Sequence, residues 1–390
     1  DLREALAEQL VSTEDFDVFE AADGHETVEK VKQAIYDLVI LDVGLPDTDG
    51  RELCRRLRKM KLHQVIREGT PDSHQEKKTT PTMGGLIILL ATFIPTLLWA
   101  KLSNRYVVIA LFSMLWMGII GFLDDYLKLK QRLLGRRDNT GLVEKYKLAG
   151  QLTLGLVLGY SLWQFPISTL PGASTTLPFY KYLLIVPASA GFAWVYVLFV
   201  TFVITGATNA VNITDGLDGL AAGLTAIAIL TFALFAYVIG RYDASQYLQL
   251  FYLRGAGELT VFCAAIMGAC IGFLWYNTHP AQVFMGDTGS LALGGALGAV
   301  AILLKSEFLL VLIGGVFVAE MTSVIIQRVV FKYRRKRHGL EYAQKNRVFR
   351  RAPLHHHFEV GGWDEAQVVV RFWILGILCA FLALSTIKLR

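Results

Sequence analysis

The sequence predicts an all-α polytopic membrane protein of about nine transmembrane helices, preceded by a small α/β segment. Hydrophobic residues make up 54% of the 390 residues and charged residues only 18%, and the mean hydropathy is +0.44. These values are too apolar for a soluble protein of this length. We expect three parts: an α/β fragment at 1–60, a cytoplasmic linker with a first polar loop at 61–82, and a transmembrane domain at 83–390.

The first 60 residues alternate helical and extended patterns. Helical periodicity covers 2–11, 25–34 and 51–60, while 17–21 and 38–41 are typical of strands. This order predicts a fragment of a parallel sheet.

The stretch 37–50 resembles the phosphoacceptor segment of response-regulator receiver domains, and the resemblance makes Asp42 the phosphoacceptor. It covers about half of such a domain. The acidic pair of the family's first strand and the hydroxyl and lysine of its last two strand-helix units have no counterpart here. We therefore expect no signalling from this segment, and a gene fusion, a cloning remnant or a gene-prediction error explains it more simply.

Nine apolar runs from Met83 onward are long enough to cross a bilayer. They are 83–100, 105–123, 148–165, 190–206, 218–238, 258–276, 288–304, 308–327 and 368–388. A short interfacial helix is expected at 179–187.

The basic residues are distributed unevenly between the loops that join these runs. Seven Lys or Arg lie in 124–147 and ten in 328–367, whereas the alternate loops hold one or two each. By the positive-inside rule, the N-terminus lies in the cytoplasm and the C-terminus outside.

With this orientation, five polar clusters fall on the cytoplasmic side. They are 77–85, 124–128, 209–219, 277–290 and 352–358. The second ends an apolar run on two adjacent carboxylates, Asp124 and Asp125, which repel each other unless a cation or a raised pKa relieves them. They indicate a metal-dependent site, and the alternative is a solvated helix end.

The other acids also have two interpretations. Thr214 or Asp215 could cap the next helix, but a cap needs one acid, and Asp215 and Asp218 would share a face of a helix that began there. Asp287 could likewise be a cap, although its flanking glycines favour a ligand site.

The basic side chains of these clusters are equally ambiguous. Lys77, Lys128 and Lys147 are either phosphate partners or positive-inside anchors. The triple histidine 355–357 is a solvated loop or contacts phosphate or sugar, since hard carboxylates suit Mg²⁺ better than imidazole does. Phosphoryl transfer at the membrane surface uses such a set, because carboxylates hold Mg²⁺ on a diphosphate and cations neutralise the transition state.

From about residue 62 onward, the chain resembles the polyprenyl-phosphate N-acetylhexosamine-1-phosphate transferase family. The motifs are Thr-Pro-Thr-Met-Gly-Gly at 80–85, Gly-Phe-Leu-Asp-Asp-Tyr at 121–126, Asn-Ala-Val-Asn-Ile-Thr-Asp-Gly-Leu-Asp-Gly-Leu at 209–220, Gln-Val-Phe-Met-Gly-Asp-Thr-Gly-Ser-Leu at 282–291 and Pro-Leu-His-His-His-Phe at 353–358. The triple histidine and the Pro-Thr-Met-Gly-Gly stretch are similar to the branch that acts on UDP-MurNAc-pentapeptide.

The resemblance implies Mg²⁺-dependent transfer of phospho-MurNAc-pentapeptide from its UDP carrier to undecaprenyl phosphate, giving lipid I and UMP at the cytoplasmic face of the bacterial inner membrane. It implies a homodimer and no nucleic-acid partner. It assigns the metal to Asp287 with Asp124 and Asp125, one of which is also the base on the lipid phosphate. The implied catalytic set adds His355, His356 and His357. The implied substrate-binding residues are Lys77, Thr82, Lys128, Lys147, Asn209, Asn212, Asp215, Asp218, Asn277, Phe284 and Gln327.

The chain departs from the family pattern at several places. The first of the family's ten spans has no counterpart, Thr79 replaces a glycine, and the loop 131–139 and the basic stretch 332–351 are longer than usual. These changes affect packing and loop conformation rather than chemistry. The alternatives are a relative that uses UDP-GlcNAc, a transporter with polar residues along a path through the membrane, and a membrane-tethered signalling protein.

Overall fold

The computed structural model describes residues 19–33, 42, 46–49, 52, 81–133, 141–168, 170–180, 183–187 and 190–387. The chain divides into two compact units, Asp1–Thr79 and Thr80–Arg390. In the first unit, helix α2 (Gly24–Gln33) confirms the helix predicted at 25–34. Asp47 accepts hydrogen bonds from the N–H groups of Gly24 and His25 at its start, at 2.8 and 2.9 Å. The other predicted helices and the strand 38–41 lie almost entirely outside the described residues.

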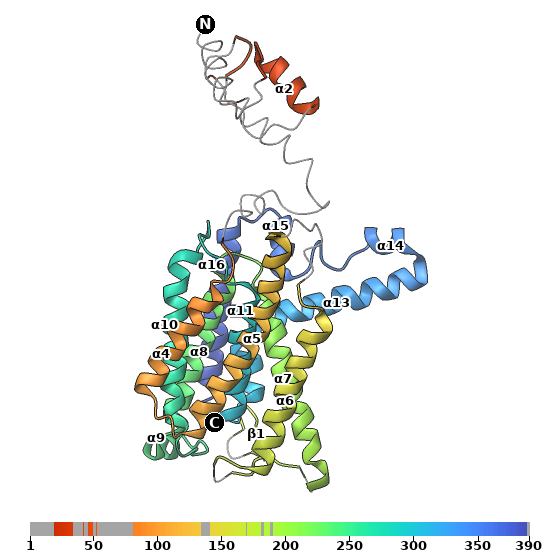
Figure 1. The fold of residues 1–390 in the computed structure, drawn as a ribbon. Helices are drawn as coiled ribbons and strands as arrows, with labels where there is room; N and C mark the ends of the chain where they lie inside the picture. Colours follow the sequence, from red (N-terminus) through yellow and green to blue (C-terminus); the bar gives the residue numbers. More distant parts are fainter. Residues whose placement is uncertain are drawn as a thin grey trace. The chain divides into compact units, whose positions relative to one another are not determined.

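The second unit is a bundle of helices (Figure 1). Its elements are α4 (Gly85–Trp99), α5 (Arg105–Leu133), α6 (Glu144–Gln164), β1 (Thr175–Thr176), β2 (Leu184–Ile185), η3 (Ala190–Phe192), α7 (Ala193–Thr214), α8 (Leu220–Ile239), α9 (Tyr242–Tyr247), η4 (Ala256–Glu258), α10 (Leu259–Asn277), α11 (Gly286–Leu303), α12 (Glu307–Ile313), α13 (Gly315–His338), α14 (Leu340–Lys345), α15 (Leu354–Val360) and α16 (Glu365–Ser385).

A helix lies at each of the nine predicted runs, but fewer of them meet the requirements of a membrane span. Six of the described helices are long and apolar enough, or seven if α12 and α13 form one span. Helix α4 has only 15 residues, and α6 does not meet the hydropathy requirement. The single helix predicted at 308–327 is wrong, because the chain bends by 87° between α12 and α13. Two glycines, Gly314 and Gly315, lie at the bend, where helix propensity is lowest.

The interfacial helix predicted at 179–187 is also not found among the described residues there. Strand β2 pairs antiparallel with β1 instead, with Thr175 opposite Ile185 and Thr176 opposite Leu184. The β-branched residues of this stretch favour a strand.

Helix α11 forms the centre of the bundle, and every residue from Thr288 to Leu303 is buried. Helices α4, α5 and α7 approach α11 at backbone level, because glycine and alanine are frequent in α11. A Cβ atom on Gly121 of α5 would collide with the Asp287 carbonyl. This close approach brings the part of α5 that carries Asp124 and Asp125 against the start of α11.

Candidate functional site

Asp125 caps α11 from the neighbouring helix α5. Its two carboxylate oxygens accept hydrogen bonds from the Asp287 N–H (3.1 Å), the Thr288 N–H (2.8 Å) and the Thr288 hydroxyl (2.7 Å). The first N–H groups of a helix have no partner within the helix and carry partial positive charge. Asp287 is therefore not the cap that it could have been, and its side chain is available for other contacts.

Asp124, in contrast, lies in a cluster of charged side chains. Its Oδ2 lies 2.5 Å from Lys128 Nζ and 2.8 Å from Lys147 Nζ. The same two ammonium groups lie 3.1 and 2.5 Å from Asp287 Oδ2. The Asp124 side chain is fully buried, whereas the lysines are partly exposed. The two adjacent aspartates thus have different surroundings.

Asn212 of α7 completes this cluster. Its Nδ2 donates to Asp287 Oδ1 and to the Ser290 hydroxyl, both at 2.9 Å. One turn earlier on α7, the amide of Asn209 exchanges hydrogen bonds with the amide of Gln151 on α6. Gln151 was not predicted from the sequence. Helices α5, α6, α7 and α11 therefore all contribute to one site.

The three aspartates fit a divalent cation. One oxygen from each of Asp124, Asp125 and Asp287 lies within 4.8 Å of the others. Three carboxylates against two lysines leave an excess of negative charge, and hard oxygen ligands suit Mg²⁺. The expectation that these three acids lie close together is confirmed.

The loop before α4 pairs with the loop before α11. Gly84 and Gly85 donate their N–H groups to the carbonyls of Phe284 (2.8 Å) and Met285 (2.9 Å). Thr82, next to them, is exposed, and Lys77 lies outside the described residues. This pairing brings the first polar loop beside Asp287.

The linker between α7 and α8 carries two acids that do not share a helix face, since α7 ends at Thr214 and α8 begins at Leu220. Asp215 is partly buried. Burial and the charges of Asp287, Asp125 and Asp218 raise the pKa of Asp215 to about 8. The negative charge of the site therefore reaches this linker.

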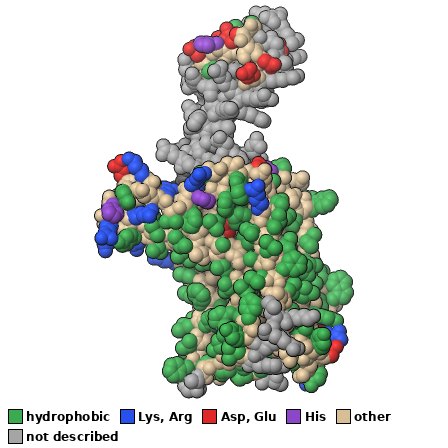
Figure 2. All heavy atoms as spheres, turned by 180° about the vertical axis from the view of Figure 1, so that it is seen from behind, with side chains coloured by type: hydrophobic (Ala, Val, Ile, Leu, Met, Phe, Trp, Pro, Cys, Tyr) green, Lys and Arg blue, Asp and Glu red, His purple; other side chains and the backbone are tan. Residues whose placement is uncertain are grey.

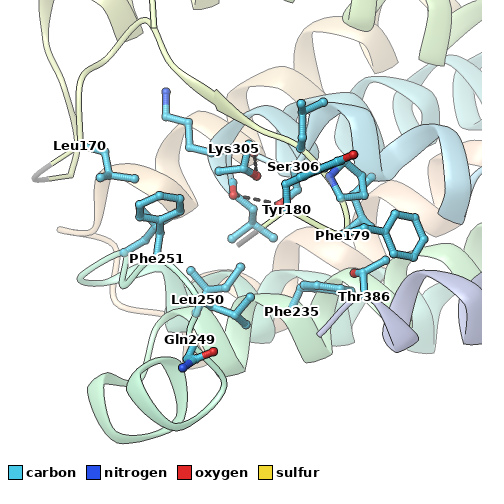
Figure 3. Close-up of a pocket in the computed structure, with 17 residues that line it drawn as sticks. Leu170, Phe179, Tyr180, Phe235, Gln249, Leu250, Phe251, Lys305, Ser306 and Thr386 are labelled. Atoms are coloured by element: carbon cyan, nitrogen blue, oxygen red, sulfur yellow. Dashed lines mark hydrogen bonds between the residues drawn. The ribbon is translucent and has the colours of Figure 1, made fainter. Parts of the chain in front are cut away.

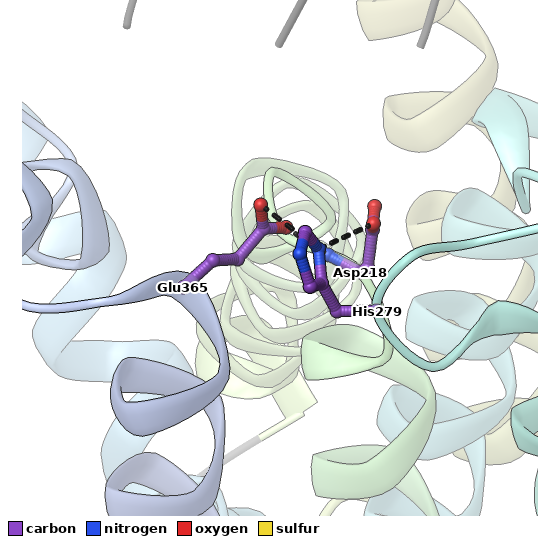
Figure 4. A group of neighbouring side chains, drawn as sticks. All are labelled: Asp218, His279 and Glu365. Atoms are coloured by element: carbon purple, nitrogen blue, oxygen red, sulfur yellow. Dashed lines mark hydrogen bonds and ion pairs between the residues drawn. The ribbon is translucent and has the colours of Figure 1, made fainter. Parts of the chain in front are cut away.

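Asp218 lies in a second group, with His279 and Glu365 (Figure 4). His279 Nδ1 lies 3.3 Å from Asp218 Oδ2 and 3.4 Å from Glu365 Oε2. Glu365 also accepts the Asp218 N–H at 2.9 Å. The group links the α7–α8 linker, the loop after α10 and the start of α16.

Asn277 is committed to the backbone. It accepts the Gly219 N–H at 3.0 Å and donates to the Val283 carbonyl at 2.8 Å. Its amide thus holds two of the site's loops together.

The three histidines lie on helix α15 rather than in a loop, and each has a different environment. His355 is buried, with its N–H and Nδ1 at 3.1 and 3.2 Å from the Glu320 carboxylate of α13. His356 lies 2.6 Å from Glu359, and burial lowers its pKa. His357 Nδ1 accepts the Arg350 N–H at 3.1 Å.

Gln327 fastens the segment that leads into this helix. It accepts the Phe349 N–H at 3.1 Å and donates to the Phe349 carbonyl at 3.4 Å. Glu320 and Glu365 were missed by sequence reasoning. Glu320 had a recognisable signal, because an acid inside an apolar run is a candidate functional residue.

Comparison with known proteins shows the family of the chain. Residues 107–305 match the family model of glycosyl transferase family 4, and residues 1–79 match that of the response regulator receiver domain. The chain is 72% identical over 341 residues to a phospho-N-acetylmuramoyl-pentapeptide-transferase of Gemmatimonas aurantiaca, covering 87% of this chain and 90% of that protein. It is 49% identical over 343 residues to the enzyme of that name from Syntrophus aciditrophicus, covering 87% and 89%.

A helical membrane bundle with this cluster and this family model is a membrane-embedded glycosyl transferase of family 4. Within that class, the chain belongs to the phospho-N-acetylmuramoyl-pentapeptide-transferase family.

Proposed function

We propose that the protein transfers phospho-MurNAc-pentapeptide from UDP-MurNAc-pentapeptide to undecaprenyl phosphate, forming lipid I and UMP for peptidoglycan synthesis. The observation that carries the proposal is the cluster of Asp124, Asp287, Lys128 and Lys147 in a chain of this family. Both substrates carry phosphate groups, and such a cluster supplies the two things that their reaction needs, a cation site and fixed positive charge.

In this proposal each residue of the cluster has its own role. Asp124 and Asp287, together with Asp125, would hold Mg²⁺, and the bound cation would neutralise charge on the diphosphate. Lys128 and Lys147 bind phosphate oxygens, because their ammonium groups lie beside the carboxylates that would hold the cation on the diphosphate. Asp124 is the better candidate for the base on the lipid phosphate, because its Oδ2 lies at the two lysines that bind phosphate, whereas Asp125 is bound to the start of α11.

The remaining predicted residues serve the donor substrate. Asp218 and Phe284 lie at the nucleoside, Asn277 holds the loops around it, and the α15 histidines face the sugar-phosphate. Asn209 supports Asn212, and Gln327 supports α15. His355 acts from a buried position, while His356 and His357 are nearer to solvent.

We also propose that the chain crosses the membrane nine times, with α12 and α13 together forming one broken span, and that the site faces the cytoplasm. The support is the basic content of the loops at the site's end of the bundle, which the positive-inside rule assigns to the cytoplasm. A labelling reagent that cannot cross membranes should reach a cysteine introduced at Glu341 only after the cells are opened.

The test of the function is UMP release by the purified protein with undecaprenyl phosphate. We expect release from UDP-MurNAc-pentapeptide that depends on Mg²⁺, and a loss of at least about 100-fold in Asp287→Asn and Asp124→Asn. The matched control is Asp243→Asn, an exposed aspartate at the other end of the bundle, which should keep full activity. Release from UDP-GlcNAc alone would overturn the proposal.

A further inference from the structure

A basic arm, defined here as residues 328–347, leaves the bundle at the end that carries the site. After the 87° bend from α12, helix α13 runs sideways out of the bundle and α14 follows it (Figure 1). Lys and Arg side chains are gathered on this projection (Figure 2). The arm holds eight Lys or Arg residues and one acid.

Most of this positive charge is not neutralised within the protein. Lys332, Arg335, Lys336 and Arg337 are exposed. Among the described residues, the ion pairs of the arm are limited to Lys345 with Glu341, at 2.9 Å. A surplus of exposed charge of one sign attracts an anionic partner.

The arm is folded rather than loose. Arg334 donates a hydrogen bond to the Asn346 carbonyl, the rings of His338 and Tyr342 lie 4.7 Å apart, and Ala343 is completely buried. Helix α14 therefore packs back on α13, and the basic side chains are held on a defined surface.

The helix that carries these charges also has an exposed apolar stripe. Ile325, Val329 and Tyr333 are 50%, 61% and 57% exposed, and their spacing of four residues places them on one helix face. A helix with an apolar face and basic flanks is suited to the boundary between acyl chains and headgroups.

We propose that the basic arm binds the anionic headgroups of the bilayer around the protein, with the apolar stripe inserted between the lipids. The bundle is membrane-spanning, so a helix that leaves it sideways at its end meets the membrane surface first. A nucleic acid or an acidic protein would match the charge but would leave the apolar stripe exposed. The arm would thus anchor α13, which carries Glu320, and keep anionic lipids beside the site.

The test measures which lipids contact the reconstituted full chain. In vesicles of phosphatidylcholine, spin-labelled phosphatidylglycerol should associate with the protein more strongly than spin-labelled phosphatidylcholine. Each Lys or Arg near an anionic surface contributes to this attraction, so Arg335→Gln/Lys336→Gln should reduce the preference by at least about twofold. High salt should reduce it in the wild type as well.

The matched control is Lys101→Gln/Arg254→Gln, which removes two exposed cations from the other end of the bundle and should leave the preference unchanged. UMP release by both variants in phosphatidylcholine vesicles reports that they are folded. An equal preference in the arm variant and the wild type would overturn the proposal. If the arm variant is in addition retained less strongly on heparin than the wild type, the partner of the arm is a polyanionic macromolecule instead of the lipids.

Discussion

Two clusters of charged side chains lie at opposite ends of α11, and they differ in the balance of positive and negative charge. Asp287 begins the helix and Lys305 follows its end, a separation of about 27 Å at 1.5 Å per residue. At the Asp287 end, three carboxylates face two partly exposed lysines. At the other end, one lysine and one acid are both buried. An unbalanced cluster needs a ligand, whereas a balanced cluster can serve the fold alone.

The cluster of Lys305 and Glu307, called the far cluster here, has hydrogen-bond partners for both charges within the protein. Lys305 donates to the Gly172 carbonyl at 2.5 Å and to the Tyr196 hydroxyl at 3.2 Å. Glu307 accepts hydrogen bonds from the hydroxyls of Thr175 (2.5 Å) and Tyr196 (3.3 Å). These contacts fasten β1 to the turn between α11 and α12.

A pocket of ≈ 70 Å³ adjoins this cluster (Figure 3). Phe179, Phe235, Leu250 and Phe251 line it together with Lys305, so it is mainly apolar. Its distance from the aspartates separates it from the proposed chemistry.

The largest effect that we predict comes from unbalancing the far cluster. Lys305→Met leaves the Glu307 carboxylate buried without its counter-charge, so the free energy of unfolding should fall by about 3 kcal/mol. UMP release per folded molecule should stay at the wild-type level. Thermal unfolding in detergent measures the loss of stability, and the UMP assay measures the activity. The exposed Lys101→Met is the control, and a selective loss of activity in Lys305→Met would contradict the division between the two ends.

Changing the charge balance at the aspartate cluster should affect the rate of the reaction rather than the stability of the protein. Lys147→Met removes a cation that lies 2.8 Å from Asp124 and 2.5 Å from Asp287. The remaining acids should bind Mg²⁺ more tightly, while the rate falls by about 10- to 100-fold because the proposed phosphate partner is lost. UMP release titrated with Mg²⁺ separates the two effects. A weaker apparent affinity for Mg²⁺ would mean that Lys147 supports the cation site rather than competing with it.

The sequence identified one of these clusters and not the other, for a physical reason. Asp124, Asp125 and Asp287 stand out because carboxylates at the ends of apolar runs are costly and need a partner. Lys305 and Glu307 lie in a three-residue connection between two apolar runs, where charged residues are ordinary. Only the fold reveals that both are buried.

The sequence also could not divide the roles within the site. Which of two adjacent aspartates caps α11 depends on the close approach at Gly121, a contact between helices far apart in the chain. The same holds for Glu320 and His355, which are 35 residues apart. The bend at Gly314 and the helix α15 were missed because short-range patterns predict helix ends poorly.

The division between Asp124 and Asp125 gives the third prediction. Asp125→Ala leaves the Asp287 and Thr288 N–H groups without their acceptor, so the free energy of unfolding should fall by about 1–2 kcal/mol. Activity should fall as well, because Asp287 loses its anchor. Asp124→Ala leaves one backbone donor, the Leu142 N–H, without its acceptor, so it should lose activity with a smaller loss of stability. Thermal unfolding of the two variants side by side distinguishes them, and equal stability would show that the cap is dispensable.

The smallest predicted effect is a dependence on pH that originates at Asp215. Its pKa is raised from 3.8 to about 8 by burial and by the charges of Asp287, Asp125 and Asp218. Between these two values the folded protein keeps a proton that the unfolded chain has lost, so stability falls as pH rises through this range. Asp215→Asn cannot ionise and avoids this loss.

The melting temperature of Asp215→Asn should therefore rise relative to the wild type as the pH increases from 6 to 8, by about 2 °C. The measurement is made without substrate or divalent cations, since a bound cation would favour the ionised carboxyl. Asp243→Asn, with an exposed carboxyl whose pKa is lowered by Arg241, should show no such rise. If the two variants behave alike, Asp215 is already ionised at pH 6. The lysines would then balance the site's acids as completely as Lys305 balances Glu307, and the excess negative charge that distinguishes the two ends of α11 would not exist.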